Sequence, residues 1–154
     1  MKKMMKARKG GFTLVELLIV IMIIAILAGM MLLATGSATD SADATKIIND
    51  IRSIKSAALL NYVDTGVWPT AATNFSTYVN ETLSPYMDRS IDTYYSSGSI
   101  ESNDSGRIYM LFDITNIDKG VKGKLQKSAK KSGLYSDQNN TEYAGGNTVG
   151  MILK

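Results

Sequence analysis

Hydrophobic and polar positions divide the chain into two very different parts. From Phe12 to Leu33 the side chains run for 22 residues with Glu16 as the one ionisable group among them. At about 1.5 Å per residue, a helix of this length spans about 33 Å, which is enough to cross a hydrocarbon core of about 30 Å. The pattern therefore predicts a membrane-spanning helix, to which we assign residues 12–34.

A second helical pattern follows the small polar segment after residue 34. Its apolar residues recur three and four positions apart, at Ile47, Ile48, Ile51, Ile54, Ala58, Leu59 and Tyr62. We expect this amphipathic segment, residues 35–63, to continue the first helix, although Gly36, Ser37 and Asp40 leave a break between the two open. Gly66 and Pro69 are typical of a helix end, because glycine caps helices and proline prevents them from resuming.

Shorter patterns fill residues 64–154, which we expect to form a globular α/β head. A short amphipathic helix before Pro85 is predicted by Phe75, Tyr78, Val79, Thr82 and Leu83. Residues 91–97 and 107–115 read as strands, with turn residues at 101–106 between them. Alternation within the second strand places four apolar side chains on one face: Ile108, Met110, Phe112 and Ile114.

The last part of the chain predicts one more helix and a closing strand. The helix covers residues 117–131 and turns Val121, Leu125 and Ala129 inward, and the strand covers residues 147–154. The fold class is therefore α+β, with a long N-terminal helix packed on a small antiparallel sheet.

The distribution of charged residues is most informative at the N-terminus. Five of the seventeen basic residues precede the apolar run: Lys2, Lys3, Lys6, Arg8 and Lys9. Without them twelve bases face fourteen acids, so the rest of the chain has no net basic character that would indicate a nucleic-acid-binding domain. Basic residues ahead of a spanning helix keep the N-terminus in the cytoplasm, so the head lies on the other side of the membrane.

Gly10, Gly11 and Glu16 need an explanation that a plain anchor or a secretory signal peptide does not give. A signal peptide has a shorter apolar region, and a simple anchor has no use for the glycines or the carboxylate. A third interpretation accounts for all three: an endoprotease cuts the open bond between Gly11 and Phe12. The new amine on Phe12 then pairs with Glu16 of a neighbouring copy, which offsets the desolvation of both charges.

The stretch GGFTLVELLIV closely resembles the prepilin signal of type IV pilins and type II secretion pseudopilins. The resemblance implies cleavage after Gly11 by a prepilin peptidase, N-methylation of Phe12, and a requirement for Glu16 in filament assembly. It divides the chain into a cleaved leader (1–11), a filament-core helix (12–34), its amphipathic continuation (35–63) and the head (64–154). The turn around Trp68 and Pro69 also resembles one in major pseudopilins, and Trp68 itself is expected to be a packing residue.

The same resemblance implies the partners and the location of the protein. The partners are further copies of the chain, related minor pilins, the prepilin peptidase and, indirectly, an assembly ATPase and an inner-membrane platform protein. In diderm bacteria a secretin joins them. The precursor is expected in the cytoplasmic membrane, and the filament outside the cell or in the periplasm.

Two polar segments of the head are weaker candidate sites. Six lysines between Lys119 and Lys131 are more simply a solvated helix face than a surface for DNA, and nucleic-acid binding is left open. The loop around Asp137, Asn139, Asn140 and Glu142 offers the oxygen ligands that Ca²⁺ prefers, although it lacks the EF-hand pattern. A plain polar loop without a cofactor is the stronger interpretation.

Nothing in the sequence indicates catalysis. The chain has no cysteine or histidine, and no paired base, nucleophile motif or phosphate-binding loop is evident. We therefore expect a structural subunit of a type IV pilus-type filament. The alternatives are a type II secretion pseudopilin and a membrane-anchored binding protein that never polymerises.

Overall fold

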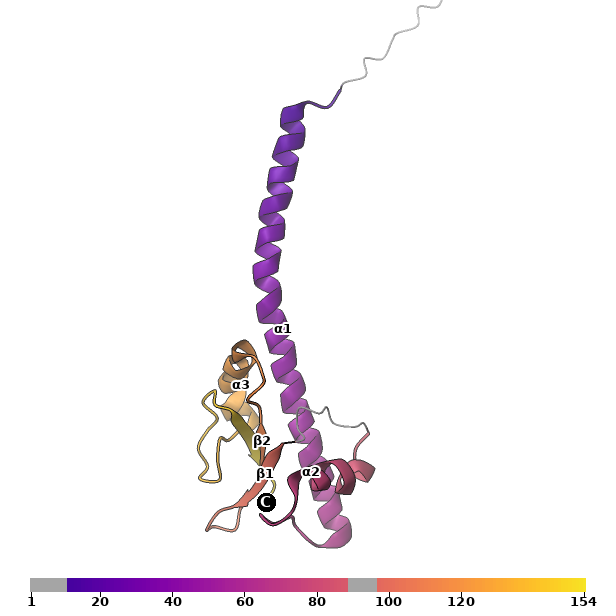
Figure 1. Cartoon of the computed structure of the whole chain (residues 1–154), viewed down its shortest axis with the longest axis vertical. Helices are drawn as coiled ribbons and strands as arrows, with labels where there is room; N and C mark the ends of the chain where they lie inside the picture. The colour runs from indigo at the N-terminus through magenta and orange to yellow at the C-terminus, as the bar shows by residue number, and fades with distance from the viewer. Residues whose placement is uncertain (1–10, 89–96) are drawn as a thin grey trace, which may run out of the picture. The chain divides into compact units, whose positions relative to one another are not determined.

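The computed structural model describes residues 11–88 and 97–154, except for the side chains of residues 33 and 34. Its elements in chain order are α1 (Leu14–Thr65), α2 (Phe75–Thr77), η1 (Tyr78–Thr82), η2 (Ser84–Tyr86), β1 (Gly98–Ser102), β2 (Ile108–Asp113), α3 (Lys119–Ser132) and β3 (Thr148–Ile152). The chain divides into two units, residues 1–38 and 39–154. This confirms the α+β class, with one long N-terminal helix and a small antiparallel sheet (Figure 1).

Helix α1 covers 52 residues and continues through Gly36, Ser37 and Asp40, so the small polar segment does not end it. The C-terminus of α1 is capped as expected: Gly66 adopts a φ of 70° and donates its backbone N–H to the Tyr62 carbonyl over 2.8 Å. A positive φ favours glycine because it has no Cβ to clash with the backbone.

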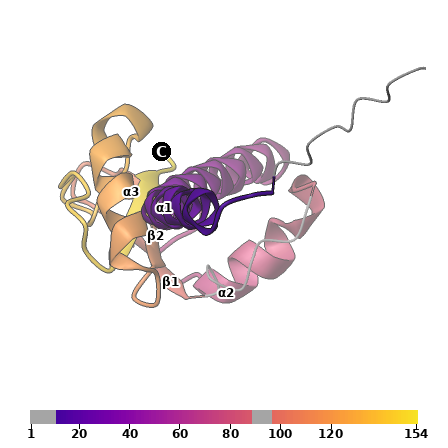
Figure 2. The same cartoon turned by 90° about the horizontal axis from the view of Figure 1, so that it is seen from above.

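The second unit is built around a three-stranded antiparallel sheet in the order β1–β2–β3. Register pairs Ile100 with Met110, and Met110 with Met151, so all three side chains share one face. Seen from above, α3 and the sheet lie on one side of the segment of α1 that belongs to this unit, and α2 lies on the other (Figure 2).

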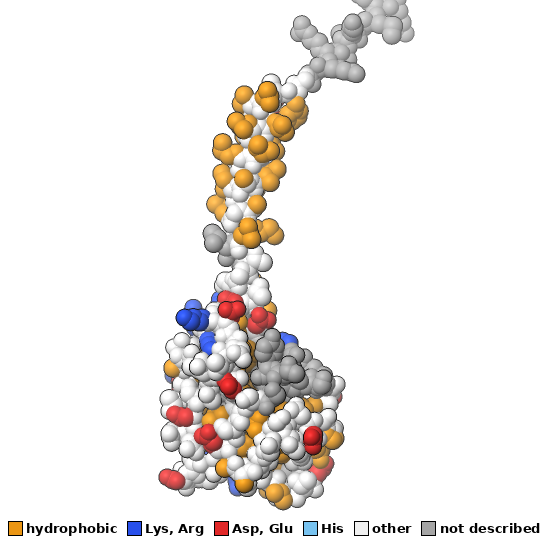
Figure 3. Space-filling model, viewed as in Figure 1, with side chains coloured by type: hydrophobic (Ala, Val, Ile, Leu, Met, Phe, Trp, Pro, Cys, Tyr) orange, Lys and Arg blue, Asp and Glu red, His pale blue; other side chains and the backbone are white. Residues whose placement is uncertain are grey.

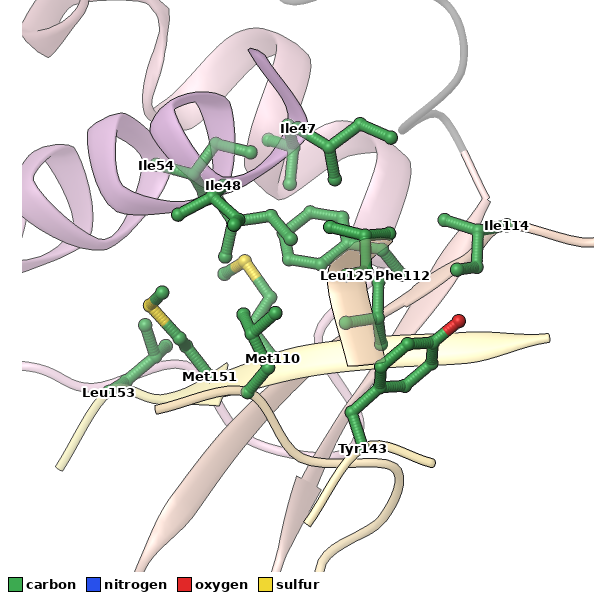
Figure 4. Packing of buried hydrophobic residues seen from close by; sticks show 14 of the residues in the cluster. Ile47, Ile48, Ile54, Met110, Phe112, Ile114, Leu125, Tyr143, Met151 and Leu153 are labelled. Carbon is green, nitrogen blue, oxygen red and sulfur yellow. The ribbon is translucent and has the colours of Figure 1, made fainter. Parts of the chain in front are cut away.

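The core forms where the amphipathic part of α1 covers that sheet face. Ile47, Ile48 and Ile54 extend from α1 over Met110 and Met151, with Leu125 of α3 beside them (Figure 4). The predicted periodicity of α1 is confirmed from Ile47 to Ala58, where the inward positions are buried, but it is wrong for Leu59 and Tyr62, which are exposed. Ile51 and Ile54 are almost fully removed from solvent.

The opposite face of the sheet is buried as well, which strict alternation along β2 did not predict. Tyr109 and Leu111 are both buried, and the Tyr109 ring meets Tyr135 edge-on at 6.0 Å. Gly150 lies opposite Leu111, where a Cβ would collide with the Met110 carbonyl and the Leu111 side chain. The segment around Tyr135 therefore forms a further layer over the sheet.

Several sequence-based boundaries need correction. β1 includes Glu101 and Ser102, which we had assigned to the turn; the actual turn is closed by Asn103, which accepts the Gly106 N–H at its carbonyl. Of the strand expected at residues 91–97, residues 91–96 lie outside the described part, and Ser97 is a bend. The expected helix before Pro85 is present as α2 and a single π-helical turn, η1, although Thr82 is exposed.

Candidate functional site at the N-terminal end of α1

The chain enters α1 through a short non-helical segment. Gly11, Phe12 and Thr13 precede the first helical residue, Leu14, and the Phe12 side chain is 81% exposed. A Cβ placed on Gly11 would meet no atom within 4 Å. The fold therefore does not itself require glycine at position 11, and the bond that follows it is sterically open.

Thr13 and Glu16 form a reciprocal capping box. The Thr13 backbone N–H and hydroxyl both donate to Glu16 Oε2, over 2.8 and 2.7 Å, and the Glu16 N–H donates to the Thr13 Oγ1 over 3.2 Å. This arrangement satisfies backbone donors that the first turn of a helix leaves without partners. A carboxylate is also favoured at a helix N-terminus by the helix dipole.

The capping box leaves one oxygen of the carboxylate available. Within the described residues Oε2 accepts both bonds from Thr13, and Oε1 accepts none. A carboxylate oxygen has two lone pairs, so Glu16 keeps capacity for a second, cationic donor while it caps its own helix.

The rest of the first unit is an exposed apolar helix. All large hydrophobic side chains described from Phe12 to Leu32 are exposed, and Figure 3 shows hydrophobic side chains along the face of the helix in view. Within the described part of the chain, α1 is long and apolar enough to cross a membrane. The leader residues Lys2, Lys3, Lys6, Arg8 and Lys9 lie outside the described residues.

Comparison with known proteins bears directly on this end of the helix. Residues 6–32 match the family described as the prokaryotic N-terminal methylation motif. That match covers the Gly11–Phe12 junction, the capping box and most of the apolar helix. Over residues 6–32 the chain therefore carries a prokaryotic N-terminal methylation motif.

Two known proteins are similar to larger parts of the chain. It is 32% identical over 78 residues to the type II secretion system core protein G of Aeromonas hydrophila; the aligned region is 51% of this chain and 54% of that protein. The chain thus spans about half the length of the curated relative it matches. Its fold is similar to that of the major type IV pilin PilA1 from Clostridium difficile, with a TM-score of 0.50 and 17% identity over 76% of this chain and 98% of that one.

The loop that the sequence suggested for calcium is held by hydrogen bonds within the second unit. Asp137 Oδ1 accepts the backbone N–H groups of Asn139 and Thr141 over 2.8 and 3.2 Å, and Asn140 adopts a φ of 68°. Burial raises the pKa of Asp137, but the hydrogen bonds from Thr141 and Asn139 outweigh it and hold the pKa below its ordinary value. The described residues contain no group of three or more acidic side chains arranged for a metal ion.

The lysine-rich helix α3 has an apolar stripe, as its spacing predicted. Val121, Leu125 and Ala129 are buried. Lys122 is the exception among the lysines: it is only 9% exposed, and its Nζ donates to the Thr115 carbonyl over 3.1 Å and to Asn147 Oδ1 over 2.9 Å. This ammonium group links the loop after β2 to the segment before β3.

Sequence reasoning overlooked Thr13 and Lys122. The T-x-x-E spacing of Thr13 and Glu16 before an apolar run is the sequence signature of a capping box, so this signal was available. Lys122 had no comparable signal, because its partners Thr115 and Asn147 are 7 and 25 residues away in sequence.

Proposed function

We propose that this chain is the structural subunit of a type IV pilus-type filament, made as a precursor that is cut after Gly11, methylated on Phe12 and polymerised through α1. The observation that carries this proposal is the methylation motif over residues 6–32 at the start of an exposed apolar helix. The pilin fold of the remaining chain supports it.

Cleavage follows from the exposed segment ahead of the helix. A protease needs an extended bond with room on both sides, and Gly11–Phe12 precedes the helical backbone. Because no neighbouring atom crowds Gly11, the requirement for glycine comes from the peptidase and not from the fold. Cutting here leaves a free amine on Phe12, next to the capping residue Thr13.

Assembly uses the two oxygens of Glu16 for different purposes. Oε2 stays bonded to Thr13 of its own chain, and Oε1 accepts the Phe12 amine of a neighbouring subunit. In an apolar surrounding an unpaired carboxylate is costly, and pairing it with a cation offsets that cost. The pair then sets the register of one helix against the next, while van der Waals packing of the apolar side chains supplies most of the cohesion.

The partners follow from the same proposal. A prepilin peptidase processes the precursor in the cytoplasmic membrane, and an assembly ATPase with a platform protein extracts it into the filament. Related minor pilins, and a secretin in diderm bacteria, complete the assembly.

A type II secretion pseudopilin is the second candidate function. It is favoured by the relative in Aeromonas hydrophila, described as a type II secretion system core protein. Deleting the gene for this chain separates the two: loss of surface filaments with normal protein secretion supports the pilus, and loss of secretion supports the pseudopilus.

The experiment that tests the shared proposal is mass spectrometry of the membrane-bound and filamentous protein. We expect mature chains that begin at Phe12 and carry one added methyl group, together with filaments visible by electron microscopy. A full-length chain, or one cut beyond residue 34, would instead indicate an anchored or exported binding protein and would contradict the proposal.

A further inference from the structure

The chain contains four Asn-x-Ser/Thr triplets without a proline in the middle. They begin at Asn74, Asn80, Asn103 and Asn139. This triplet is the acceptor sequence for N-linked glycosylation, in which a sugar is attached to the side-chain amide of the asparagine. The triplet is short, so the sequence alone does not show which copy is an acceptor. The structure separates the four by the hydrogen bonds of each asparagine side chain.

Two of these triplets lie in helical segments, and their asparagine side chains are bonded there. Asn74 caps α2, because its Oδ1 accepts the Thr77 N–H over 3.0 Å. Asn80 lies in η1, where its Nδ2 donates to Ser76 Oγ over 3.2 Å. An enzyme that must enclose the amide of its acceptor would have to unwind these turns first.

The third triplet closes the turn between β1 and β2. Asn103 Oδ1 accepts the backbone N–H groups of Ser105 and Arg107 over 3.1 and 3.0 Å. Its Nδ2 donates to the Tyr109 hydroxyl over 3.5 Å, and the residue is half-buried. This side chain holds the turn together, so an enzyme could reach its amide only by opening the turn.

Asn139 differs from the other three because its side chain is not used by the fold. Asn139 is exposed, and within the described residues its side-chain amide takes part in no hydrogen bond. Its backbone N–H is held by Asp137 Oδ1 over 2.8 Å. The third residue of the triplet, Thr141, is also exposed. The amide of Asn139 can therefore enter an enzyme without any loss of structure.

The backbone around Asn139 forms a tight, well-defined turn. The Ser136 N–H donates to the Thr141 carbonyl over 2.9 Å and closes its base. The middle residue of the triplet, Asn140, adopts a φ of 68°, a left-handed conformation that asparagine tolerates better than most residues. Surface turns of this kind are where N-linked sugars are expected in proteins outside the cytoplasm.

We propose that Asn139 is an N-glycosylation site, modified by an oligosaccharyltransferase that uses a lipid-linked oligosaccharide as donor. The Asn139 Nδ2 forms a bond to the anomeric carbon of the first sugar, and the bond from that carbon to the lipid phosphate breaks. The amide gives up one proton to a base of the transferase, and the lipid phosphate is the leaving group. This inference rests on the proposed function, because the transfer requires the second unit to lie outside the cytoplasm.

The position of the turn leaves room for a bulky group. In Figures 1 and 2 the gold connection between α3 and β3, which contains Asn139, lies at the outer edge of the second unit, away from its segment of α1. A sugar attached there would be hydrated on the surface and would not disturb the packing of α1 on the sheet.

Mass spectrometry of the chain purified from its own cells tests the proposal. We expect the wild-type chain to be heavier than its processed sequence by the mass of at least one sugar residue, with the added mass on the peptide that contains Asn139. Asn139→Gln and Thr141→Ala should each remove the added mass, because each destroys the acceptor triplet. Thr141→Ser keeps the triplet and should retain it.

Asn80→Gln is the matched control, because it removes another exposed asparagine of the same triplet pattern and should leave the added mass in place. Asn139 and Thr141 are exposed, so their substitution should not unfold the second unit. All these variants should still be cut after Gly11.

Each contrary outcome is distinct. Wild-type chains that start at Phe12 and form filaments without any added sugar would overturn this inference and leave the proposed function intact. Added mass that is lost in Thr141→Ala but kept in Asn139→Gln would indicate an O-linked sugar, and added mass on another triplet would indicate another acceptor; either overturns the inference. An uncut wild-type chain without filaments would overturn the proposed function, and the mass of the Asn139 peptide would still decide this inference by itself.

Discussion

At the scale of single residues, the cost of a carboxylate in an apolar helix is reduced by a neighbour in the same chain. A charged residue in a spanning helix costs about 2.5–3.5 kcal/mol at the centre, and less near the end. Thr13 gives Glu16 two hydrogen bonds before any partner subunit is present. The two contributions of Glu16, to capping and to assembly, can therefore be separated by mutation.

Glu16→Leu, Glu16→Gln and Thr13→Ala form a set that separates them. Glu16→Leu should be inserted and cut normally yet fail to enter filaments, because the acceptor for the Phe12 amine is lost. Glu16→Gln keeps an oxygen for the cap but lacks the charge, so it should assemble almost as poorly. Thr13→Ala loses the threonine hydroxyl from the cap, at about 0.5–2 kcal/mol, and keeps the charge, so its filament yield should fall less.

Filament yield by electron microscopy and cleavage by mass spectrometry measure all three variants. Wild-type yield from Glu16→Leu would show that the carboxylate has another purpose. Near-wild-type yield from Glu16→Gln together with a loss of yield from Thr13→Ala would mean that helix capping alone explains the phenotype.

Gly11→Val should leave the leader attached. The site has room for a larger side chain, so the fold tolerates the substitution, but a β-branched residue stiffens the backbone and crowds a protease cleft shaped for glycine. The full-length mass should dominate in membrane protein from this variant. Gly36→Ala is the matched control, because it is equally uncrowded but lies away from the junction, and it should be cut normally.

At the scale of elements, helices and their ends could be predicted from the periodicity of the sequence. The limits of a strand and the second buried face of the sheet could not, because they depend on contacts between residues far apart in the chain. The apolar spacing of α3, that of α1 from Ile47 to Ala58, and the glycine cap at Gly66 were correct because each is a local pattern. The extent of β1 was wrong because Glu101 and Ser102 are typical turn residues, and pairing with β2 overrides that preference. The buried second face of β2 depends on Tyr135, which is 26 residues from Tyr109.

The oxygen-rich loop at Asp137 forms a turn in which the Asp137 carboxylate accepts two backbone N–H groups. The folded-state pKa of Asp137 is lowered, so its charge stabilises the fold above the ordinary Asp range and that stabilisation disappears as the pH falls through the lower, folded-state value. Asp137→Asn should therefore be less stable than wild type at pH 7, by up to about 1 kcal/mol, and the difference should shrink as the pH falls through the folded-state pKa of Asp137.

Thermal unfolding of the full chain in detergent, followed by circular dichroism, measures this difference. Chelating calcium should leave the melting temperature of the wild type unchanged at pH 7. A drop on chelation, absent in Asp137→Asn, would instead support a calcium ion in this loop.

At the scale of the whole molecule, the remaining question is whether charge guides the packing of heads. In the sequence, residues 64–118 hold eight acids against two bases, and residues 119–154 hold seven bases against two acids. Folding mixes these acidic and basic regions in part. The Lys154 carbonyl accepts the Ile108 N–H, so the C-terminal lysine lies beside β2, and Lys122 is buried. What persists is the exposed row Lys127, Lys130 and Lys131 on α3.

Reversing Lys127, Lys130 and Lys131 to glutamate tests whether this row faces acidic residues of the next subunit, such as the exposed Asp104 on the β1–β2 turn. Each exposed ion pair contributes only about 0–1 kcal/mol and is screened over about 8–10 Å at ordinary salt. Repetition along a filament multiplies this small bias, so the triple variant should give fewer or more fragile filaments at low salt and approach the wild type at high salt. Adding Asp104→Lys should restore part of the yield, because it recreates attraction with the signs exchanged. Filaments of the triple variant that match the wild type at every salt concentration would show that the lysine row is only a solvated helix face.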